Sequence, residues 1–277
     1  MPELPEAEVV AQQLRARLVG AILTGFWIGR SDIVREGLNS ASWYCGSSLQ
    51  SVDRYGKSVA LGFQRKSEVR YVVAELGMTG LLLFESAQIK HTQHVHARLS
   101  FAGGKEAELR YWNPRRFGRL SLLDHEGLHR YVSRRFGYDP LKVTREEFMA
   151  LIKGRRARLK PLLMHQQTIA GIGNIYANEI LFRAGLHPNS LASRLRRVKI
   201  DRLYKITQAV LQEAIAWGGS SVRDFFAPDG KEGQYKRFHL IYGKEGQPCP
   251  NHCGRMIRRF QSERSSFFCP RCQGRKS

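Results

Sequence analysis

Near the start of the chain, a pattern with spacings of three and four includes Val9, Val10, Gln13, Leu14 and Leu18. This period predicts a helix over residues 6–19 with one buried face. Pro5 suits the first turn of that helix, and the glutamates around it suit the positive end of the helix dipole. The chain is therefore expected to open with a helix.

From residue 21 to residue 124 the pattern changes to short runs of β-branched and aromatic residues that are separated by glycines. Such runs predict strands. No helical pattern interrupts them, which favours a sandwich or a barrel. The runs are AILTGFWIG, SVALGFQ, RYVVAEL, GLLLFE, HARLSFAGG, AELRYW and GRLSLLD.

Beyond the strands, residues 127–141 are interpreted as a connector, and the helical pattern then returns. The helix expected at 174–184 is followed by Gly185 and Pro188, which are typical of the residues just past a helix. The other expected helices are 145–153, 159–165 and 197–217. The predicted order is one helix, a β domain, a helical domain and a metal-binding tail.

Length and charge narrow the function. The chain has 277 residues, which is enough for two compact domains. Its formal net charge of +21 favours a polyanion as partner, with nucleic acid ahead of an anionic membrane surface. The start lacks the apolar core of a secretory signal, and no apolar run approaches the roughly 20 residues of a membrane span. We therefore expect a cytoplasmic protein.

Four of the five cysteines lie near the end of the chain in the pattern C-x3-C-x15-C-x2-C. In a reducing compartment this spacing predicts one zinc ion rather than disulfides, and four thiolates leave no open position for a substrate. The zinc is therefore expected to be structural. His252 competes with the first cysteine for one ligand position, and we favour the cysteine; Cys45 has no assigned role. The expected ligands are Cys249, Cys253, Cys269 and Cys272.

Two segments suit phosphate groups. Gly171 and Gly173 precede a helix that begins at Asn174, which is compatible with a phosphate seat and with close helix packing. The stretch between the cysteine pairs is compatible with a phosphate-binding hairpin and with a solubilising surface. Its arginines are Arg255, Arg258, Arg259 and Arg264.

Several motifs occur in one order along the chain: PELPE at the start, YGK at 55–57, LGMTG at 76–80, NPRRFGRL at 113–120, AGIGNIYANEILFRAGLHP at 170–188, and the cysteine tail. This ordered set resembles the formamidopyrimidine-DNA glycosylases, bifunctional base-excision repair enzymes of the helix–two-turn–helix superfamily. Leu4 favours this branch over the sister endonuclease VIII group, which usually reads PEGPE. The resemblance covers the chain from its first residue to its last.

The resemblance implies an α+β fold in three parts. An N-terminal catalytic β-sandwich with a flanking helix is expected at 1–134, and a helical helix–two-turn–helix domain at 135–243. A zinc finger is expected at 244–277. Residues 221–238, within the second part, match the family's lesion-sensing loop.

The resemblance also assigns the chemistry. After removal of Met1, the Pro2 amine attacks C1′ of the damaged nucleotide, expels the base and forms a Schiff base that eliminates the 3′ and then the 5′ phosphate. An α-amino group titrates near about pH 8, so a neutral fraction is available at neutral pH. Glu3 is expected to be the general acid for opening of the sugar ring, and Glu6 to orient the terminus and the sugar.

Further residues match family contacts to DNA. Lys57 and Arg264 match residues that contact phosphate and assist the elimination steps. Glu8, in contrast, is interpreted as an ordinary acid on the helix surface. A flipped base leaves a gap in the duplex that needs filling. The matching void-filling residues are Met78, Arg115 and Phe117, with core packing as the alternative for Met78 and Phe117. The remaining expected DNA contacts are His91, Arg155 and Asn174.

The expected function is removal of oxidised purines, such as 8-oxoguanine and formamidopyrimidines, with β,δ-elimination at the resulting abasic site. One alternative is an endonuclease VIII-like activity on oxidised pyrimidines, and another is a non-catalytic DNA-damage-binding protein. The residues Pro2 and Glu3 argue against the second alternative. The expected partner is double-stranded DNA with a damaged base, bound by a monomer that associates with the nucleoid.

Overall fold

The computed structural model describes residues 2–87, 93–222 and 225–274. The chain forms two compact units, each built from two segments. The first unit combines Met1–Arg134 with Ile215–Lys236, and the second combines Arg135–Ala214 with Arg237–Ser277. Residues 215–236, which include most of the expected lesion-sensing loop, thus belong to the same unit as the N-terminal part of the chain.

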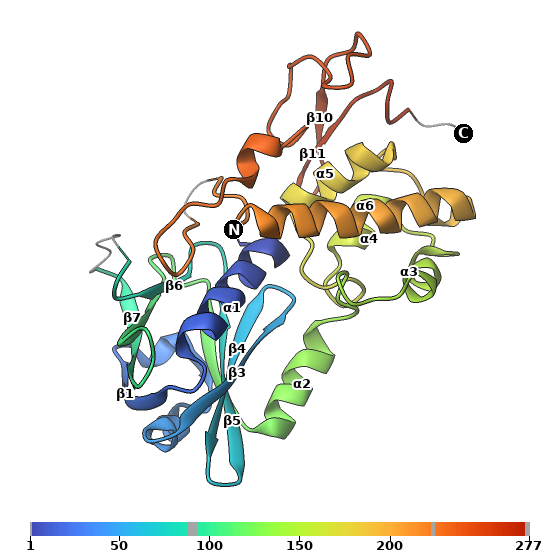
Figure 1. The fold of residues 1–277 in the computed structure, drawn as a ribbon. Helices are drawn as coiled ribbons and strands as arrows, with labels where there is room; N and C mark the ends of the chain where they lie inside the picture. The colour runs from blue at the N-terminus through green and yellow to red at the C-terminus, as the bar shows by residue number, and fades with distance from the viewer. Residues whose placement is uncertain (1, 88–92, 223–224, 275–277) are drawn as a thin grey trace. The chain divides into compact units, whose positions relative to one another are not determined.

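A nine-stranded sheet forms the body of the first unit (Figure 1). Its order is β2-β9-β5-β4-β3-β1-β7-β8-β6, and the neighbours are antiparallel except for the β2–β9 pair. The strands are β1 (Ile22–Ile28), β2 (Val34–Glu36), β3 (Ser48–Tyr55), β4 (Ser58–Arg65), β5 (Glu68–Glu75), β6 (Leu81–Phe84), β7 (Val95–Ala102), β8 (Glu108–Trp112) and β9 (Arg119–Leu123).

The two halves of this sheet share one hydrophobic core. They join at the pairing of Ile22 in β1 with Ser48 in β3. Leu23 and Leu99 from one half lie in the same buried cluster as Leu61 and Phe63 from the other half. A sheet that turns back on itself in this way encloses its core as two packed layers do.

Helix α1 (Leu4–Leu18) confirms the predicted N-terminal helix and packs on β3 and β4 (Figure 1). Its apolar side chains Leu4, Val10, Leu14 and Leu18 are fully or almost fully buried, as the spacing of three and four requires. Seven of the strands lie over the predicted runs. Strands β2 and β3 were not among them.

Helix α2 (His125–Arg135) corrects the interpretation of residues 127–141 as a connector, because the first part of that stretch is helical. Its buried side chains Leu128 and Tyr131 lie three residues apart among polar neighbours, which is too little apolar period for recognition by sequence. The Tyr131 hydroxyl lies 3.0 Å from Ser58 Oγ and donates to Glu75 Oε1 at 3.1 Å.

The second unit contains helices close to all four predicted ranges: α3 (Arg145–Ile152), α4 (Leu159–Met164), α5 (Asn174–Ala184) and α6 (Arg197–Ala216), of which α6 ends at the boundary between the units. Gly185, at φ +68°, ends α5 in the left-handed conformation, as predicted. A hairpin of β10 (Arg258–Gln261) and β11 (Ser265–Phe268) follows. Short 3-10 helices are η1 (Ser31–Ile33), η2 (Leu38–Tyr44), η3 (Ala192–Arg194) and η4 (Tyr235–Phe238).

The mixed composition confirms the α+β class. Over the part of the chain that the structure describes, no helix combines the length and the apolar character needed to cross a membrane.

Candidate active site and nucleic-acid contacts

The first turn of α1 is buried together with its carboxylates. Pro2 is buried, and Glu3 and Glu6 are only 2% and 1% exposed. Glu6 Oε2 accepts the backbone N–H of Glu3 at 2.7 Å, which fixes the residue directly after Pro2. The proline expected to be the nucleophile is therefore buried, directly before a residue whose backbone Glu6 holds.

The same Glu6 carboxylate binds the segment that leads into residues 221–238. Its Oε1 atom accepts the backbone N–H of Ser220 at 2.7 Å. A side chain at Gly219, which has φ +80°, would place its Cβ only 2.8 Å from that oxygen. Glu6 thus joins the first turn to the start of the expected lesion-sensing loop.

The two ends of this loop pair with each other. Ser220 and Gln234 form an antiparallel bridge, the Gln234 N–H donates to Trp217 O at 2.8 Å, and the Tyr235 N–H donates to Gly219 O at 3.0 Å. Farther along the loop, the Asp229 N–H donates to Gln13 Oε1 on α1 at 3.1 Å. The loop is therefore held at its base and at Asp229 by residues of the first unit.

The turn that carries Lys57 is supported by an ion pair that sequence reasoning missed. Arg54 Nε donates to Glu8 Oε2 at 2.7 Å, and Arg54 Nη1 donates to Gly56 O at 3.3 Å. The Arg54 side chain is 3% exposed and that of Glu8 is 18% exposed. The interpretation of Glu8 as an ordinary surface acid was therefore wrong, because its carboxylate neutralises a buried guanidinium beside the Lys57 turn.

The expected void-filling residues occupy two turns that touch. A Cβ at Gly77, whose φ is +61°, would lie 2.5 Å from the backbone N of Gly118. Met78 is 36% exposed, Phe117 is 54% exposed, and the Arg115 guanidinium lies 4.8 Å from the centre of the Phe117 ring. Such exposure does not fit the core-packing alternative for Met78 and Phe117.

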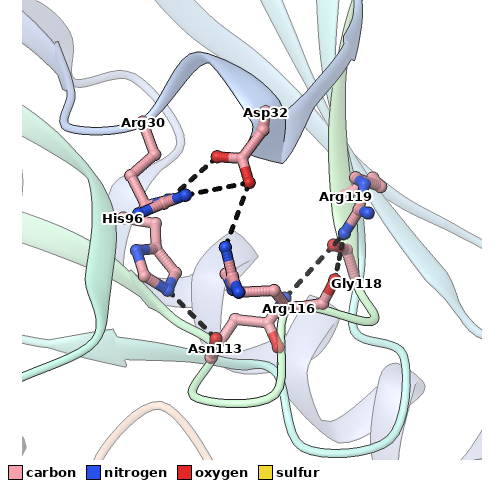
Figure 2. Close-up of polar contacts among 7 residues, drawn as sticks. All are labelled: Arg30, Asp32, His96, Asn113, Arg116, Gly118 and Arg119. Carbon is pink, nitrogen blue, oxygen red and sulfur yellow. Dashed lines mark hydrogen bonds and ion pairs between the residues drawn. The ribbon is translucent and has the colours of Figure 1, made fainter.

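Ion pairs and hydrogen bonds from side chains hold the turn at residues 113–118 in place (Figure 2). Arg116 has φ +52° and donates from Nη1 to Asp32 Oδ2 at 3.3 Å. Arg30 holds the same carboxylate with contacts of 2.9 and 3.2 Å. Arg119 Nη1 donates to Gly118 O at 2.9 Å and also to Arg116 O. The arrangement keeps a non-glycine residue in the left-handed region between Arg115 and Phe117.

A buried polar pair lies at the start of the same turn. His96 Nε2 lies 3.0 Å from Asn113 O (Figure 2), and burial lowers the pKa of His96. Asn113 Nδ2 donates to Gly118 O and to the Tyr111 hydroxyl, each at 3.2 Å. Burial raises the pKa of Tyr111, whose hydroxyl donates to Glu75 O at 2.6 Å. A neutral His96 ring is suited to donating to the Asn113 carbonyl.

In the second unit, one side chain, Gln166, holds the loop that leads into α5. Gln166 Oε1 accepts the Gly171 N–H at 2.9 Å, and Gln166 Nε2 donates to Ile172 O at 2.8 Å. Gly171 has φ +89°, and Asn174 begins α5 with its side chain partly exposed. The loop is fixed in front of a helix N-terminus, which suits the phosphate-seat interpretation.

Helix α5 also holds the hairpin that carries Arg264. Asn178 Nδ2 donates to Asn174 O at 2.6 Å, and Asn178 Oδ1 accepts the Phe267 N–H at 2.8 Å. The next residue, Glu179, is fully buried, and its carboxylate accepts backbone N–H groups of Leu240, Ile241 and Tyr242 at 2.9–3.0 Å. Asn174 and the hairpin are thus connected through Asn178.

One expected DNA contact, Arg155, is not drawn into these clusters. Arg155 is exposed between α3 and α4, where its carbonyl accepts the Ser193 N–H at 2.9 Å. His91 lies outside the described residues. Arg264 is exposed at the hairpin tip.

The four terminal cysteines gather into one candidate metal site. Their Sγ atoms all lie within 4.8 Å of one another, with Cys249–Cys272 at 3.7 Å and Cys253–Cys269 at 3.4 Å. Zn–S bonds of about 2.3 Å place tetrahedral sulfurs about 3.8 Å apart, so the geometry fits zinc. His252 is exposed, at φ +49°, and Cys249 occupies the fourth position instead.

The fold and these sites define a class: an α+β nucleic-acid enzyme with a buried N-terminal proline, a glycine-led helix start and a four-cysteine zinc finger. Comparison with known proteins agrees. Residues 1–120 match the N-terminal domain of formamidopyrimidine-DNA glycosylase, residues 136–226 match its H2TH domain, and residues 246–274 match the zinc finger found in FPG and IleRS. The chain belongs to the formamidopyrimidine-DNA glycosylase family.

Individual relatives cover the whole chain. The formamidopyrimidine-DNA glycosylase of Solibacter usitatus is 40% identical over 99% of this chain and 100% of its own. The crystal structure of MutM (Fpg) from Thermus thermophilus matches with TM-score 0.85, 35% identity and full coverage of both chains. The complex of Lactococcus lactis Fpg with DNA containing an abasic site matches with TM-score 0.87 and 28% identity, over 99% of this chain and 100% of that one.

Proposed function

We propose that this chain excises oxidised purines from double-stranded DNA with Pro2 as nucleophile and then cleaves the abasic site. Membership of the family makes it a DNA glycosylase with AP lyase activity. The solved structures similar to it include complexes with DNA that contains carbocyclic 8-oxo-G or Fapy-dG. The observation that carries the catalytic assignment is the buried first turn, in which one carboxylate fixes both Glu3 and Ser220.

The chemistry begins at the terminal amine once Met1 has been removed. The neutral Pro2 nitrogen forms a bond to C1′ as the bond from C1′ to the base breaks, and the base leaves with the electron pair. The departing base anion then takes the proton from the new ammonium nitrogen. Opening of the sugar breaks the C1′–O4′ bond as the nitrogen lone pair forms the iminium double bond to C1′. The α-amino group suits this step because its ordinary pKa of about 8 leaves a neutral fraction at neutral pH.

Glu3 is proposed to protonate O4′ as the ring opens. Glu3 directly follows Pro2 and is only 2% exposed, so it is shielded from bulk water next to the proposed nucleophile. Glu6 is proposed to position the terminus, because both of its oxygens already accept backbone N–H groups. These roles divide the two acids into one that transfers a proton and one that holds the geometry.

The eliminations need phosphate contacts. Loss of the C2′ proton from the iminium ion expels the 3′ phosphate, and a second elimination expels the 5′ phosphate. We assign Lys57 and Arg264 to the phosphates that leave, because a cation stabilises the developing negative charge. Asn174, at the start of α5, and the exposed Arg155 are proposed to bind the backbone on either side.

The flipped nucleotide leaves a gap, which we assign to Met78, Arg115 and Phe117. All three are exposed or nearly so on two turns that contact each other through Gly77 and Gly118. Residues 221–238 are proposed to read the extruded base, because Glu6 ties their start to the catalytic turn. We further propose that the protein acts as a monomer on chromosomal DNA in the cytoplasm.

Borohydride trapping on a duplex with 8-oxoguanine opposite cytosine tests this function. Borohydride reduces the iminium ion to a stable amine, so the wild type should form a covalent adduct that peptide mapping places on Pro2. Pro2→Gly should lose most of the adduct, and Glu3→Gln should lose base excision while the protein still binds DNA.

Two results would refute the proposal. One is intact protein that gives no adduct, and the other is base excision that is unchanged in both variants. Mass spectrometry of the native protein is a simpler check, because retained Met1 would block the proposed nucleophile. A parallel assay with an oxidised pyrimidine tests the endonuclease VIII-like alternative.

A further inference from the structure

Two adjoining hollows lie in the second unit, at the C-terminal end of α5. One has a volume of about 710 Å³ and the other about 440 Å³. Both are lined by Gly185, Leu186, Lys199 and Gly274, so they form one continuous groove. Asn174 begins α5 and Gly185 ends it, so the groove lies about 16 Å along the helix axis from the proposed phosphate seat.

The lining of this groove is strongly positive. Among the residues that the structure describes, no Asp or Glu lines either hollow. Cations line it from end to end, and an anion that enters the groove relieves their mutual repulsion. These cations are Arg158, Arg183, Arg194, Lys199, Arg202 and Arg271.

Two of the arginines are oriented by neutral groups. Arg202 Nη2 donates to Arg183 O at 3.1 Å, and Arg271 Nη1 donates to Cys253 O at 2.8 Å. Backbone carbonyls of this kind position a guanidinium without cancelling its charge. Arg183 differs, because Glu213 accepts from its Nη1 at 2.6 Å. The net charge of the groove therefore rests mainly on the other five cations.

The groove continues toward the residues proposed to bind phosphate. A third hollow, of about 490 Å³, is lined by Arg264 at the hairpin tip and shares Arg158 and Asn189 with the smaller hollow of the groove. The third hollow is also lined by one carboxylate, Glu263, next to Arg264. Cations therefore run from Arg264 past Arg158 to Arg271, with a single acidic residue at the Arg264 end. Charge with this continuity fits a chain of phosphates better than it fits a single small anion.

We propose that this groove, defined by Arg158, Arg194, Lys199, Arg202 and Arg271, binds the phosphodiester backbone of DNA away from the lesion. The proposal goes beyond the proposed function, because none of these residues takes part in excision or contacts the damaged nucleotide in it. The bound backbone belongs either to the flank of the same duplex or to a second duplex. Both sources present the same phosphates. Binding to the flank should depend on the length of the lesion duplex, whereas binding to a second duplex should depend on the concentration of added DNA.

The test variant is Lys199→Gln together with Arg202→Gln, two exposed positions on one face of α6. The control removes two exposed charges elsewhere, with Arg130→Gln and Lys205→Gln. Both proteins are used as full chains loaded with zinc. Excision from a 13-base-pair lesion duplex should be unchanged in both, which shows that the catalytic parts are intact.

The first arm measures affinity for 13- and 40-base-pair lesion duplexes between 50 and 200 mM KCl. If the groove binds the flank, the wild type shows a steeper salt dependence on the longer duplex. The test variant should lose about 1.8 from the slope of log K against log salt on that duplex, at about 0.9 per phosphate contact. The control should keep the wild-type slope.

The second arm adds a labelled undamaged duplex to a complex already formed on the 13-base-pair lesion duplex. If the groove binds a second molecule, a ternary complex forms with the wild type and the control, and its affinity falls about tenfold in the test variant at low salt. The proposal is overturned if the test variant matches the wild type in both arms. Borohydride trapping on the 13-base-pair duplex is scored separately, so failure of the groove is distinguishable from failure of the catalytic assignment.

Discussion

Glu6 and Ser220, which are 214 positions apart in the chain, are joined by a hydrogen bond of 2.7 Å from the Ser220 N–H to the Glu6 carboxylate. The other oxygen of that carboxylate accepts the Glu3 N–H at the same distance. One buried side chain therefore holds both the turn proposed to be catalytic and the start of the loop proposed to read the base. A change at this carboxylate should disturb both functions at once.

Glu6→Gln replaces one of the two accepting oxygens with an amide group that donates. One buried N–H then loses its partner, which costs about 1.5–3 kcal/mol for a bond to a charged group. We expect base excision to slow by about 10- to 100-fold under single-turnover conditions, the equivalent of that energy. Glu126→Gln, at an 86% exposed side chain, is the charge-matched control and should retain the wild-type rate. An unchanged rate in Glu6→Gln would contradict the positioning role.

Gly118→Ala tests the close packing beneath one of the two turns proposed to fill the void. A Cβ there would lie 2.2 Å from both Glu75 O and the Tyr111 hydroxyl, so the turn has to move. Overpacking of this kind costs about 1–3 kcal/mol, and we expect both a lower free energy of unfolding and slower excision. Gly25→Ala is the control, since its Cβ would meet Ser100 at an ordinary 3.5 Å. Urea unfolding and single-turnover excision together measure the outcome.

Asp32→Asn removes the charge that holds Arg116 in its left-handed conformation. The pair is half exposed, so we expect a modest effect of about twofold to fivefold slower excision at low salt, the size typical of one surface ion pair. The difference should disappear in 0.5 M KCl, which screens exposed charges. The difference between the wild type and Asp32→Asn should also be absent on a duplex that lacks a base opposite the lesion. In that duplex the turn proposed to fill the void has no unpaired base to contact. An equal effect on both duplexes would show a general structural role instead.

The same ion pair predicts a direction for pH. The Arg30 guanidinium, through its hydrogen bond, lowers the pKa of the Asp32 carboxyl below its usual range. Asp32 is therefore charged at neutral pH, and its hold on Arg116 is lost only as the pH falls through that lowered pKa. The ratio of wild-type to Asp32→Asn excision rates should stay constant between pH 6 and pH 8.

Glu179→Gln tests how α5 holds the segment that leads into the zinc finger. The fully buried carboxylate accepts three backbone N–H groups, and an amide cannot accept from all of them. We expect the free energy of unfolding to fall by about 2–3 kcal/mol, with faster release of zinc. Glu146→Gln, at a 75% exposed side chain, should leave both quantities unchanged.

Removal of zinc should abolish DNA binding but leave the nine-stranded sheet folded. The protein should contain one zinc per chain, and Cys269→Ser or a strong chelator should unfold the β10–β11 hairpin, because structural zinc supplies about 10 kcal/mol or more of folding energy. Hydrogen exchange should then rise in the hairpin and stay slow in strands β3 to β5. Lesion-duplex binding should be lost with the hairpin, since Arg264 lies at its tip. Hairpin amides that stay protected after metal removal would contradict the structural role.

Local features of the fold and the site were readable from the sequence. The period of apolar residues predicted α1 and the helices α3 to α6, because a helical face repeats within a few residues. The cysteine spacing predicted the metal site, because few chemistries use four thiolates so close together. The ordered motifs indicated the family, and the comparisons confirmed it.

Features that depend on distant contacts were not readable. Helix α2 buries too few apolar residues to show a period, and Tyr131 acquires its role only through Ser58 and Glu75. Glu8 has the local sequence of a surface acid, and only the path of β3 brings Arg54 to it.

By itself, then, the sequence determined helices α1 and α3 to α6, most strands of the sheet and the four-cysteine metal site, and it indicated the first turn that is proposed to be catalytic. Each of these depends on residues close in the chain or on a motif with a narrow chemical meaning. The tertiary structure alone decided that Glu6 meets Ser220, that Gly77 lies against Gly118, and that cations from separate segments line one groove. Such contacts follow from how the chain returns on itself, and no local pattern of residues records that path.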